Sequence, residues 1–275
     1  MIHARGLEVR YGTRTVASVP ELDVGAGECV AIVGESGSGK SSTLMALLGL
    51  AEGAQVSGEV YVCGVDVLNA TPRRLRELRG AKAALVMQSP QAALCPTTRL
   101  GTLMLRALRL HGIGRDESPG RWQAWPSAEQ AGQRTGQRAR QWAWPSAGRM
   151  RHRMAEAMRA VLLDPVLLSR YPHEVSGGQA QRFAIALAIA LGAKVILADE
   201  PTSALDVTVQ AEVIGVLRRL RETRGLGLLL VSHDLALVST IADRVVVMKD
   251  GRVVDSAPFA ELSHPYSREL LEAVL

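Results

Sequence analysis

The stretch GESGSGKS, from Gly34 to Ser41, follows an apolar run, ECVAIV, and precedes a segment with helical character, KSSTLMALLGL. Its Gly34, Gly39, Lys40 and Ser41 have the spacing of a phosphate-binding loop. The glycines let successive backbone N–H groups turn toward phosphate oxygens, and the positive end of the next helix points at the same anion. A strand, this loop and a helix in succession predict a nucleotide-binding α/β fold.

A dinucleotide-binding loop is the competing interpretation of the same glycines. That loop needs a third glycine or alanine, and the run GSGKSS has Ser42 in its place. We therefore expect a nucleoside triphosphate, with Lys40 reaching the β- and γ-phosphates, Ser41 binding Mg²⁺ and Ser42 bonding the α-phosphate. The other loop residues expected at the phosphates are Ser36, Gly37 and Ser38.

A second element with acidic residues, VILADE, ends at Glu200. Val195 to Ala198 are apolar enough for a central strand, so Asp199 falls at the carboxyl end of a buried strand. There it is placed to bind Mg²⁺, directly or through water, and Glu200 would face an attacking water as general base. A solvated strand end is the alternative, and the phosphate loop upstream makes it weak.

Strands and helices alternate on both sides of these motifs. Short strands are expected from Gly6 to Val33, an exposed basic helix in TPRRLRELRG, and a hairpin that turns at Asp250-Gly251. The pattern predicts an α/β fold: a P-loop NTPase with a RecA-like, mostly parallel sheet, an antiparallel β subdomain and an α-helical subdomain. We expect one domain over 1–275, with the β subdomain and core at about 1–88 and 190–275, and the helical subdomain at about 89–189.

The composition limits the class of protein. Hydrophobic residues make up 47% of the chain, yet the longest apolar run, Phe183 to Ala198, is interrupted and too short to span a bilayer. The N-terminus lacks the apolar segment of a signal peptide, so we expect a soluble or peripheral, cytoplasmic protein. Cys29, Cys63 and Cys95 lack metal-ligand spacing and are expected to be buried, reduced thiols.

The net charge of +5 comes from one segment. Residues 112–153 hold eight arginines against three acidic residues, so the rest of the chain is formally neutral, which argues against a nucleic-acid-binding surface. The same segment contains all four tryptophans and two copies of AWPSA. We expect a flexible, exposed insertion at about 112–153; contact with a membrane or a partner is the alternative.

The glycine loop, VSGGQ, ADEPTSALD and VSHD occur in this order, and together they resemble the ATPase subunit of an ABC (ATP-binding cassette) transporter. The resemblance covers nearly the whole chain outside the insertion, and it implies ATP and Mg²⁺ as ligands. It places Tyr11 against adenine, although a packed strand residue is the alternative. It also implies that Gln88 contacts Mg²⁺ or the attacking water, and that His233 holds the γ-phosphate and Glu200.

The same resemblance explains the second glycine pair. In this family the SGGQ turn caps ATP bound to the opposite subunit, so Ser176, Gly177, Gly178 and Gln179 would complete a neighbour's site, and Asp206 lies in the loop that crosses between subunits. The partner would be a second ABC ATPase, identical or different. Val175 replaces the more usual leucine before SGGQ, which we expect to be harmless.

Three segments, YPHEVSGGQAQR, QSPQAALCP and HPYSRELLEAVL, resemble the peptide/nickel importer ATPases. That branch implies two transmembrane permease subunits, an extracytoplasmic solute-binding protein, and a peripheral location on the cytoplasmic face of the inner membrane. A non-transport ABC protein, such as an accessory subunit of a phosphonate-degradation complex, remains the alternative. ABC translation and DNA-repair ATPases are disfavoured, because this chain has neither two cassettes nor long coiled-coil insertions.

Overall fold

The computed structural model describes residues 1–113 and 148–272, which fall into two compact units. The unit that we call the sheet unit consists of Met1–Gln88, Ala193–Ala204 and Leu217–Leu275; the helical unit consists of Ser89–Gly192 and Leu205–Val216. The sequence assigned about 89–189 to the helical subdomain. The sequence did not assign Leu205–Val216 to that subdomain. This segment contains the first half of a helix, α8 (Val207–Arg224), whose second half belongs to the sheet unit.

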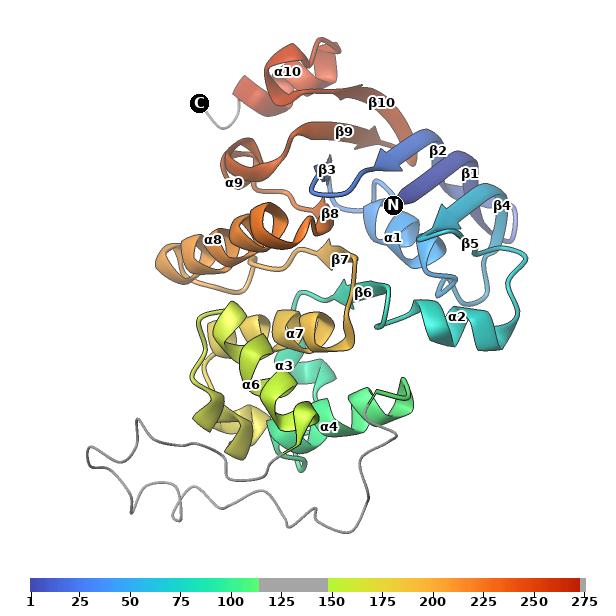
Figure 1. Ribbon diagram of the computed structural model, residues 1–275. Helices are drawn as coiled ribbons and strands as arrows, with labels where there is room; N and C mark the ends of the chain where they lie inside the picture. Colours follow the sequence, from blue (N-terminus) through green and yellow to red (C-terminus); the bar gives the residue numbers. More distant parts are fainter. Residues whose placement is uncertain (114–147, 273–275) are drawn as a thin grey trace. The chain divides into compact units, whose positions relative to one another are not determined.

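The sheet unit contains one ten-stranded sheet in the order β5-β4-β1-β2-β10-β9-β3-β8-β7-β6 (Figure 1). Its strands are β1 (Ile2–Tyr11), β2 (Arg14–Val24), β3 (Cys29–Val33), β4 (Gln55–Val62), β5 (Val65–Asp66), β6 (Ala83–Val86), β7 (Val195–Asp199), β8 (Gly227–Val231), β9 (Arg244–Lys249) and β10 (Arg252–Ala257). β9, β3, β8, β7 and β6 are mutually parallel, whereas β2, β1, β4 and β5 are antiparallel. The predicted parallel core and antiparallel subdomain are confirmed, as two parts of a continuous sheet.

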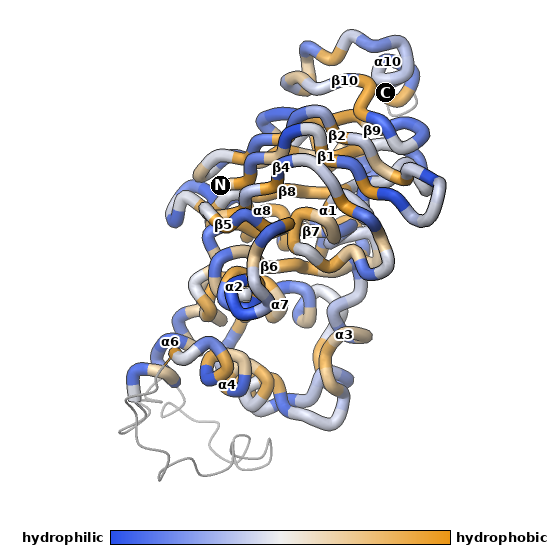
Figure 2. The backbone as a smooth tube through the Cα atoms, turned by 90° about the vertical axis from the view of Figure 1, so that its right-hand side faces the viewer, coloured by the Kyte–Doolittle hydropathy of each residue, from blue (hydrophilic) through white to orange (hydrophobic). Residues whose placement is uncertain are grey.

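The parallel strands are apolar because both of their faces are covered. Every residue of β3 (CVAIV) and of β8 (GLLLV) is buried, and Figure 2 shows β8 as a hydrophobic strand. Parallel sheets covered on both faces read as continuous apolar runs. These runs could therefore be recognised as central strands from sequence alone.

The first two strands are longer than the sequence suggested. β1 and β2 have ten and eleven residues and pair along most of their length, so the expectation of short strands was wrong. Gly6, with φ +57°, lies inside β1, and the pairing of β1 with β4 shifts between Arg5 and Glu8. The glycine forms a bulge that bends the strand instead of ending it.

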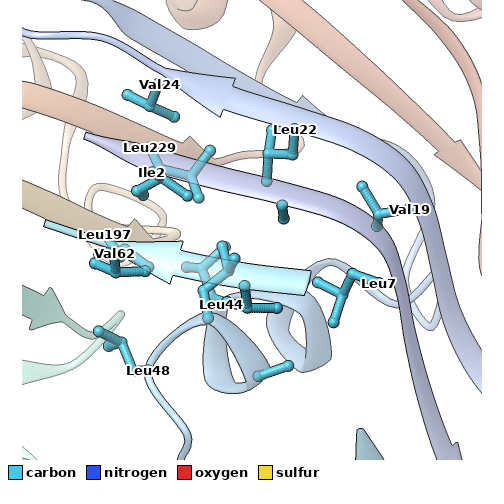
Figure 3. Close-up of a cluster of buried hydrophobic side chains, with 14 of the residues drawn as sticks. Ile2, Leu7, Val19, Leu22, Val24, Leu44, Leu48, Val62, Leu197 and Leu229 are labelled. Carbon is cyan, nitrogen blue, oxygen red and sulfur yellow. The ribbon is translucent and has the colours of Figure 1, made fainter. Parts of the chain in front are cut away.

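Helix α1 (Lys40–Leu47) is enclosed by the sheet, which curls so that β4, β1, β2 and β7 all contact it. Leu44 lies in a cluster with Ile2 and Val62 from the antiparallel part and with Leu197 and Leu229 from the parallel part (Figure 3). All five side chains are fully buried, and burial of each contributes roughly 1.5–3 kcal/mol. The packing fixes α1, and with it the loop that precedes α1.

The other helices of the sheet unit are short, apart from the part of α8 that belongs to it. They are α2 (Pro72–Leu78), α9 (Leu235–Ile241), α10 (Pro265–Glu272) and the 3₁₀ helix η5 (Phe259–Glu261). Thr71 caps α2 by accepting the N–H of Arg74 at 3.4 Å, and Figure 2 shows α2 as hydrophilic. The predicted exposed helix and its start are confirmed.

The helical unit holds α3 (Pro90–Ala93), α4 (Leu100–Leu110), α6 (Arg149–Ala160), η3 (Pro165–Ser169), η4 (Pro172–Glu174), α7 (Gly177–Leu191) and the first part of α8 (Val207–Arg224). The Trp-rich part of the predicted insertion lies outside the described residues. The end of that prediction was wrong, because Arg149 to Arg153 begin α6. In α6, Met150, Met154 and Met158 are buried at helical spacing, and α6 packs on α4 and α7.

Two composition-based expectations can be compared with the structure. Within the described ranges, no helix combines the length and the apolar character needed to cross a bilayer. All three cysteines are free, but only Cys29 is buried; Cys63 is half-buried and Cys95 is exposed. The expectation of three buried thiols was therefore wrong for two of them, because both lie in connecting segments outside the core strands.

Candidate active site

The strand order brings the predicted catalytic residues to one edge of the sheet. β3, β8, β7 and β6 are neighbours and parallel, with Ile32 paired to Val231, Asp199 to Val231 and Val86 to Ala198. Their carboxyl ends therefore lie in a row, and this edge is where α/β sheets bind ligands. The phosphate loop follows β3, His233 follows β8, Glu200 follows β7 and Gln88 follows β6.

The phosphate loop connects buried β3 to α1, and two of its glycines cannot be replaced without strain. Gly34 has φ +145°, and a Cβ there would lie 2.1 Å from the carbonyl oxygen of Met248. Gly39, at the N-terminus of α1, has φ +96°, and its Cβ would lie 2.3 Å from the carbonyl oxygen of Val16. The loop is thus held between β9 and β2, with its curvature set by residues that lack a side chain.

Lys40 is the first residue of α1, and its ammonium group is wrapped by its own loop. Nζ donates to the carbonyl oxygens of Gly34 (2.8 Å) and Glu35 (2.7 Å) and lies 3.4 Å from Oγ of Ser38. Burial lowers the pKa of Lys40, whereas the nearby carboxylates Glu200, Asp199 and Glu35 act in the opposite direction. A buried cation in a ring of oxygens at a helix N-terminus is a suitable receptor for phosphate.

Ser41 and Asp199 meet although 158 residues separate them in sequence: Oγ of Ser41 donates to Oδ1 of Asp199 at 3.1 Å. Burial raises the pKa of Asp199, and the bond from Ser41 partly offsets this. A hydroxyl and a carboxylate side by side fit Mg²⁺, which takes one or two protein oxygens and completes its shell with phosphate and water. No larger cluster of acidic, His or Cys side chains suited to a metal occurs among residues 1–113 and 148–272.

Glu200 and His233 form a pair beside this position. Nδ1 of His233 lies 3.1 Å from Oε1 of Glu200. Glu200 has φ +46°, an uncommon backbone conformation for this residue, and its N–H donates to the carbonyl oxygen of Val231 at 2.9 Å. Such a conformation costs roughly 1–3 kcal/mol and tends to occur at functional sites. The conformation places the Glu200 carboxylate next to the phosphate loop, where His233 can orient it.

The predicted nucleotide contacts all remain predictions, including those of Gln88 and Tyr11. Gln88 is exposed, two residues beyond Val86 at the end of β6, so it follows the strand next to β7. Tyr11 ends β1, its side chain is 42% exposed, and it pairs with Arg14 in the turn toward β2. The alternative for Tyr11, a residue packed in the sheet, does not agree with that exposure.

The SGGQ turn starts α7 in the helical unit. Oγ of Ser176 accepts the N–H of Gln179 at 3.2 Å, and Oε1 of Gln179 accepts the N–H of Ser176 at 3.0 Å. This capping box satisfies two groups at the helix start, while the N–H groups of Gly177 and Gly178 have no partner within the helix. The turn therefore presents backbone donors at the positive end of a 15-residue helix.

Gly178 also has a packing role that the sequence did not reveal. It is buried, and a Cβ there would lie 2.1 Å from Cγ1 of Val209 in α8. Arg182 adds a second link between α7 and α8 through an ion pair with Glu212 at 3.2 Å. Asp206, exposed at the start of α8, accepts the N–H of Val209 at 3.0 Å. The SGGQ turn at the start of α7 and the Asp206 loop at the start of α8 thus lie where these two helices pack together.

Replacing Gly178 with alanine should lower the stability of the chain by about 1–3 kcal/mol, because the stiff β-branched Val209 must move. Thermal unfolding measures this effect. The double variant Gly178→Ala/Val209→Ala should recover most of the lost stability. An unchanged melting temperature of Gly178→Ala would contradict the close packing. If the double variant is stable but inactive in ATP hydrolysis, Gly178 has a second role in approaching the nucleotide.

Gln91 is a further residue that sequence reasoning missed. Its Nε2 donates to the carbonyl oxygen of Val175 at 2.9 Å, so α3 is hydrogen-bonded to the residue just before the SGGQ turn. Gln91 follows Gln88 by three residues. This hydrogen bond links the segment after Gln88 to the residue that precedes the SGGQ turn. Gln91 and Val175 are 84 positions apart in the sequence, so no local pattern indicates their contact.

The model of the family described as ABC transporter matches residues 18–203, which include the phosphate loop, the SGGQ turn and the Asp199–Glu200 strand end. The chain belongs to the ABC transporter family. Its ATPase cassettes bind and hydrolyse ATP, so this chain is an ATP-binding cassette with the ATPase activity that its family implies. The competing interpretation of the glycine loop, a dinucleotide-binding loop, does not apply.

Relatives and solved structures agree with this assignment. A Brucella ovis protein named a peptide import ATP-binding protein is 36% identical over 282 residues, which cover 100% of this chain and 78% of the relative. The glutathione import ATP-binding protein GsiA of Salmonella paratyphi A is 36% identical over 289 residues, covering 100% of this chain and 41% of GsiA. The cassette MJ0796, solved as a dimer after hydrolysis with ADP and Pi, superposes with a TM-score of 0.69 at 25% identity, covering 94% and 98% of the two chains.

Proposed function

We propose that this cassette powers the import of peptides, through ATP binding and hydrolysis at a site shared between two ATPase subunits. The observation that carries the ATP site is the convergence of Lys40, Ser41, Asp199, Glu200 and His233 at the carboxyl ends of adjacent parallel strands. The importer assignment is supported by the names of the relatives, which specify peptide or glutathione import. Glutathione is itself a tripeptide, and these names favour peptides over nickel and a transport ATPase over the phosphonate-degradation alternative.

The geometry suggests how hydrolysis proceeds. Lys40 and the backbone N–H groups of the loop hold the β- and γ-phosphates and stabilise the charge that spreads over them. Glu200 takes a proton from the water whose oxygen attacks the γ-phosphorus, and the bond to ADP breaks. His233, 3.1 Å from Glu200, keeps the carboxylate oriented and donates toward the γ-phosphate. Tyr11 is assigned to adenine stacking, and Ser36, Gly37, Ser38 and Ser42 to the remaining phosphate contacts.

Mg²⁺ is assigned to Ser41 and Asp199, with Gln88 as a further oxygen ligand or as a contact of the attacking water. When bound, the ion would neutralise part of the negative charge of the phosphates. The hydrogen bond between Ser41 and Asp199 holds both oxygens ready on the same side of the loop. This preorganisation lowers the cost of ordering them when the nucleotide arrives.

The SGGQ turn is assigned to the nucleotide of a second ATPase subunit. The free N–H groups at the start of α7 and the hydroxyl of Ser176 would then meet the γ-phosphate, and Asp206 would contact the partner. ATP would bind the closed pair more tightly than the open one, and hydrolysis would remove that preference. The dimeric MJ0796 structure with ADP and Pi supports this arrangement.

The remaining partners follow from the importer assignment. We assign two transmembrane permease subunits, an extracytoplasmic solute-binding protein and a second ATPase, identical or different, with this chain peripheral on the cytoplasmic side of the membrane. No nucleic acid is involved.

The proposal is tested by two measurements on the same protein. The purified chain, alone and in the complex recovered from membranes, should hydrolyse ATP only with Mg²⁺. Cells that lack the chain should lose uptake of labelled di- and tripeptides, and the wild-type gene should restore it. Normal peptide uptake in such cells would contradict the cargo assignment, whereas absence of ATP hydrolysis in both preparations would contradict the site.

A further inference from the structure

A contact from the C-terminal helix reaches the phosphate loop, and the hydrolysis mechanism does not use it. Tyr266 is the second residue of α10, and its hydroxyl donates to Oε1 of Glu35 at 3.1 Å. Glu35 is the second residue of GESGSGKS, and the two residues are 231 positions apart. Only 5% of the Tyr266 residue is exposed, whereas Glu35 is exposed. A buried aromatic side chain therefore holds a carboxylate of the loop.

The position of Tyr266 is fixed by several interactions within the sheet unit. Nζ of Lys249, the last residue of β9, lies 4.1 Å from the centre of the Tyr266 ring, a cation–π contact. Oδ2 of Asp255 in β10 accepts the N–H groups of Ser263 and His264, both at 2.9 Å, and the N–H of Tyr266 donates to Nδ1 of His264 at 3.2 Å. Helix α10 lies beside β10 in both views of the molecule (Figures 1 and 2).

Glu35 is electrostatically coupled to the lysine that receives the phosphates. Its backbone carbonyl oxygen accepts a hydrogen bond from the ammonium of Lys40 at 2.7 Å, so the Glu35 side chain belongs to a residue in direct contact with that lysine. The Glu35 carboxylate is one of three negative charges near this ammonium, with those of Glu200 and Asp199. A carboxylate that stabilises the ammonium also competes with a triphosphate for it and repels the phosphates.

The hydroxyl of Tyr266 limits this competition. Burial and the bond to Glu35 raise the pKa of Tyr266, so the hydroxyl keeps its proton at neutral pH and acts as the donor. A donor that holds one carboxylate oxygen restricts the side chain and spreads its charge. Without the hydroxyl, the exposed Glu35 side chain would lose this hydrogen bond and with it the restraint on its orientation.

We propose that Tyr266 is a positioning residue for ATP binding: it holds the Glu35 carboxylate so that Lys40 stays available to the β- and γ-phosphates. Tyr266 acts only through Glu35 and does not itself touch the nucleotide. The inference rests on the proposed ATP site. It assigns to the C-terminal HPY segment a role in nucleotide affinity.

The test is a double-mutant cycle on the full-length chain, with ATP affinity measured by titration calorimetry and KM and kcat by phosphate release. Tyr266→Phe keeps the ring and its contact with Lys249, and it should weaken ATP binding and raise KM by about three- to tenfold, with kcat nearly unchanged. Glu35→Gln removes the competing charge and should bind ATP at least as well as the wild type. In the Glu35→Gln background, Tyr266→Phe should have little further effect.

Tyr61→Phe is the matched control, because Tyr61 lies in β4 with 43% exposure, and it should leave KM unchanged. The proposal is overturned if Tyr266→Phe binds ATP like the wild type, or if its effect is equally large with Gln at position 35. A lower melting temperature with unchanged KM would likewise reduce Tyr266 to a packing role. Lack of ATP binding by the wild-type chain would instead overturn the proposed function, and this inference with it.

Discussion

Glu200→Gln is expected to slow steady-state ATP hydrolysis by about 10²- to 10⁴-fold, the contribution typical of a general base. Glutamine has nearly the same shape, so the backbone at φ +46° and the bond to Val231 are retained. Its amide oxygen can still accept from His233, but it cannot take the proton of the attacking water. ATP affinity should stay within about threefold of the wild type, a change of less than 1 kcal/mol, and the nucleotide-bound dimer should accumulate.

Phosphate release and ATP titration on the same preparation measure both parts of this result. Glu222→Gln is the matched control, because Glu222 is an exposed carboxylate near the end of α8, and it should leave turnover unchanged. If Glu200→Gln kept more than about a tenth of the wild-type turnover, well above the loss expected for a general base, the assignment of Glu200 would be wrong. Loss of ATP binding together with turnover would point to a structural role instead.

Lys40→Ala is expected to weaken ATP binding by about 10- to 100-fold, because the β- and γ-phosphates lose a charged hydrogen-bond donor. The carbonyl oxygens of Gly34 and Glu35 also lose the ammonium that they share, so the loop becomes less ordered. Titration calorimetry with ATP in the presence of Mg²⁺ measures the affinity. Thermal unfolding is recorded alongside, because Lys40 is buried and a misfolded variant would imitate the result.

Lys194→Ala provides the comparison for this variant. Lys194 is exposed just before β7 and should tolerate the change without loss of ATP affinity. A folded Lys40→Ala chain that binds ATP as tightly as the wild type would show that the nucleotide does not lie on the phosphate loop.

The edge of the sheet that holds Lys40, Ser41 and Asp199 could be predicted from the sequence because its signals are local. The loop spacing identifies Lys40, and four apolar residues before Asp199 identify a strand end. Parallel α/β topology then places both at the same edge of the sheet. The hydrogen bond between Ser41 and Asp199 shows that the start of α1 and the end of β7 do meet at this edge.

What could not be predicted depends on pairing between distant segments. The clash of a Gly178 side chain with Val209, the bond from Gln91 to Val175 and the bond from Tyr266 to Glu35 have no periodic signature. A glycine in a strand pattern, such as Gly6, can mark either the end of a strand or a bulge within it. The length of β1 therefore follows only from its pairing with β2 and β4.

The claim that the SGGQ turn completes the ATP site of a neighbouring ATPase is tested most directly by disulfide cross-linking. Ser36 and Ser176 are exposed and can carry the cysteines, in a chain that also carries Glu200→Gln to trap ATP. Cys95 must first be changed to serine, because hydrogen bonds with Thr97 and Thr98 lower its pKa to about 7 and make an exposed thiol reactive.

In the isolated chain, we predict a cross-link between position 36 of one copy and position 176 of the other. In the membrane complex, where the two cysteines lie on the two ATPase subunits, we predict the same cross-link between one of these positions in this chain and the equivalent of the other position in its partner. It should form with ATP and Mg²⁺ and be lost with ADP. If ATP binds normally and no such cross-link forms in either preparation, the shared site is contradicted.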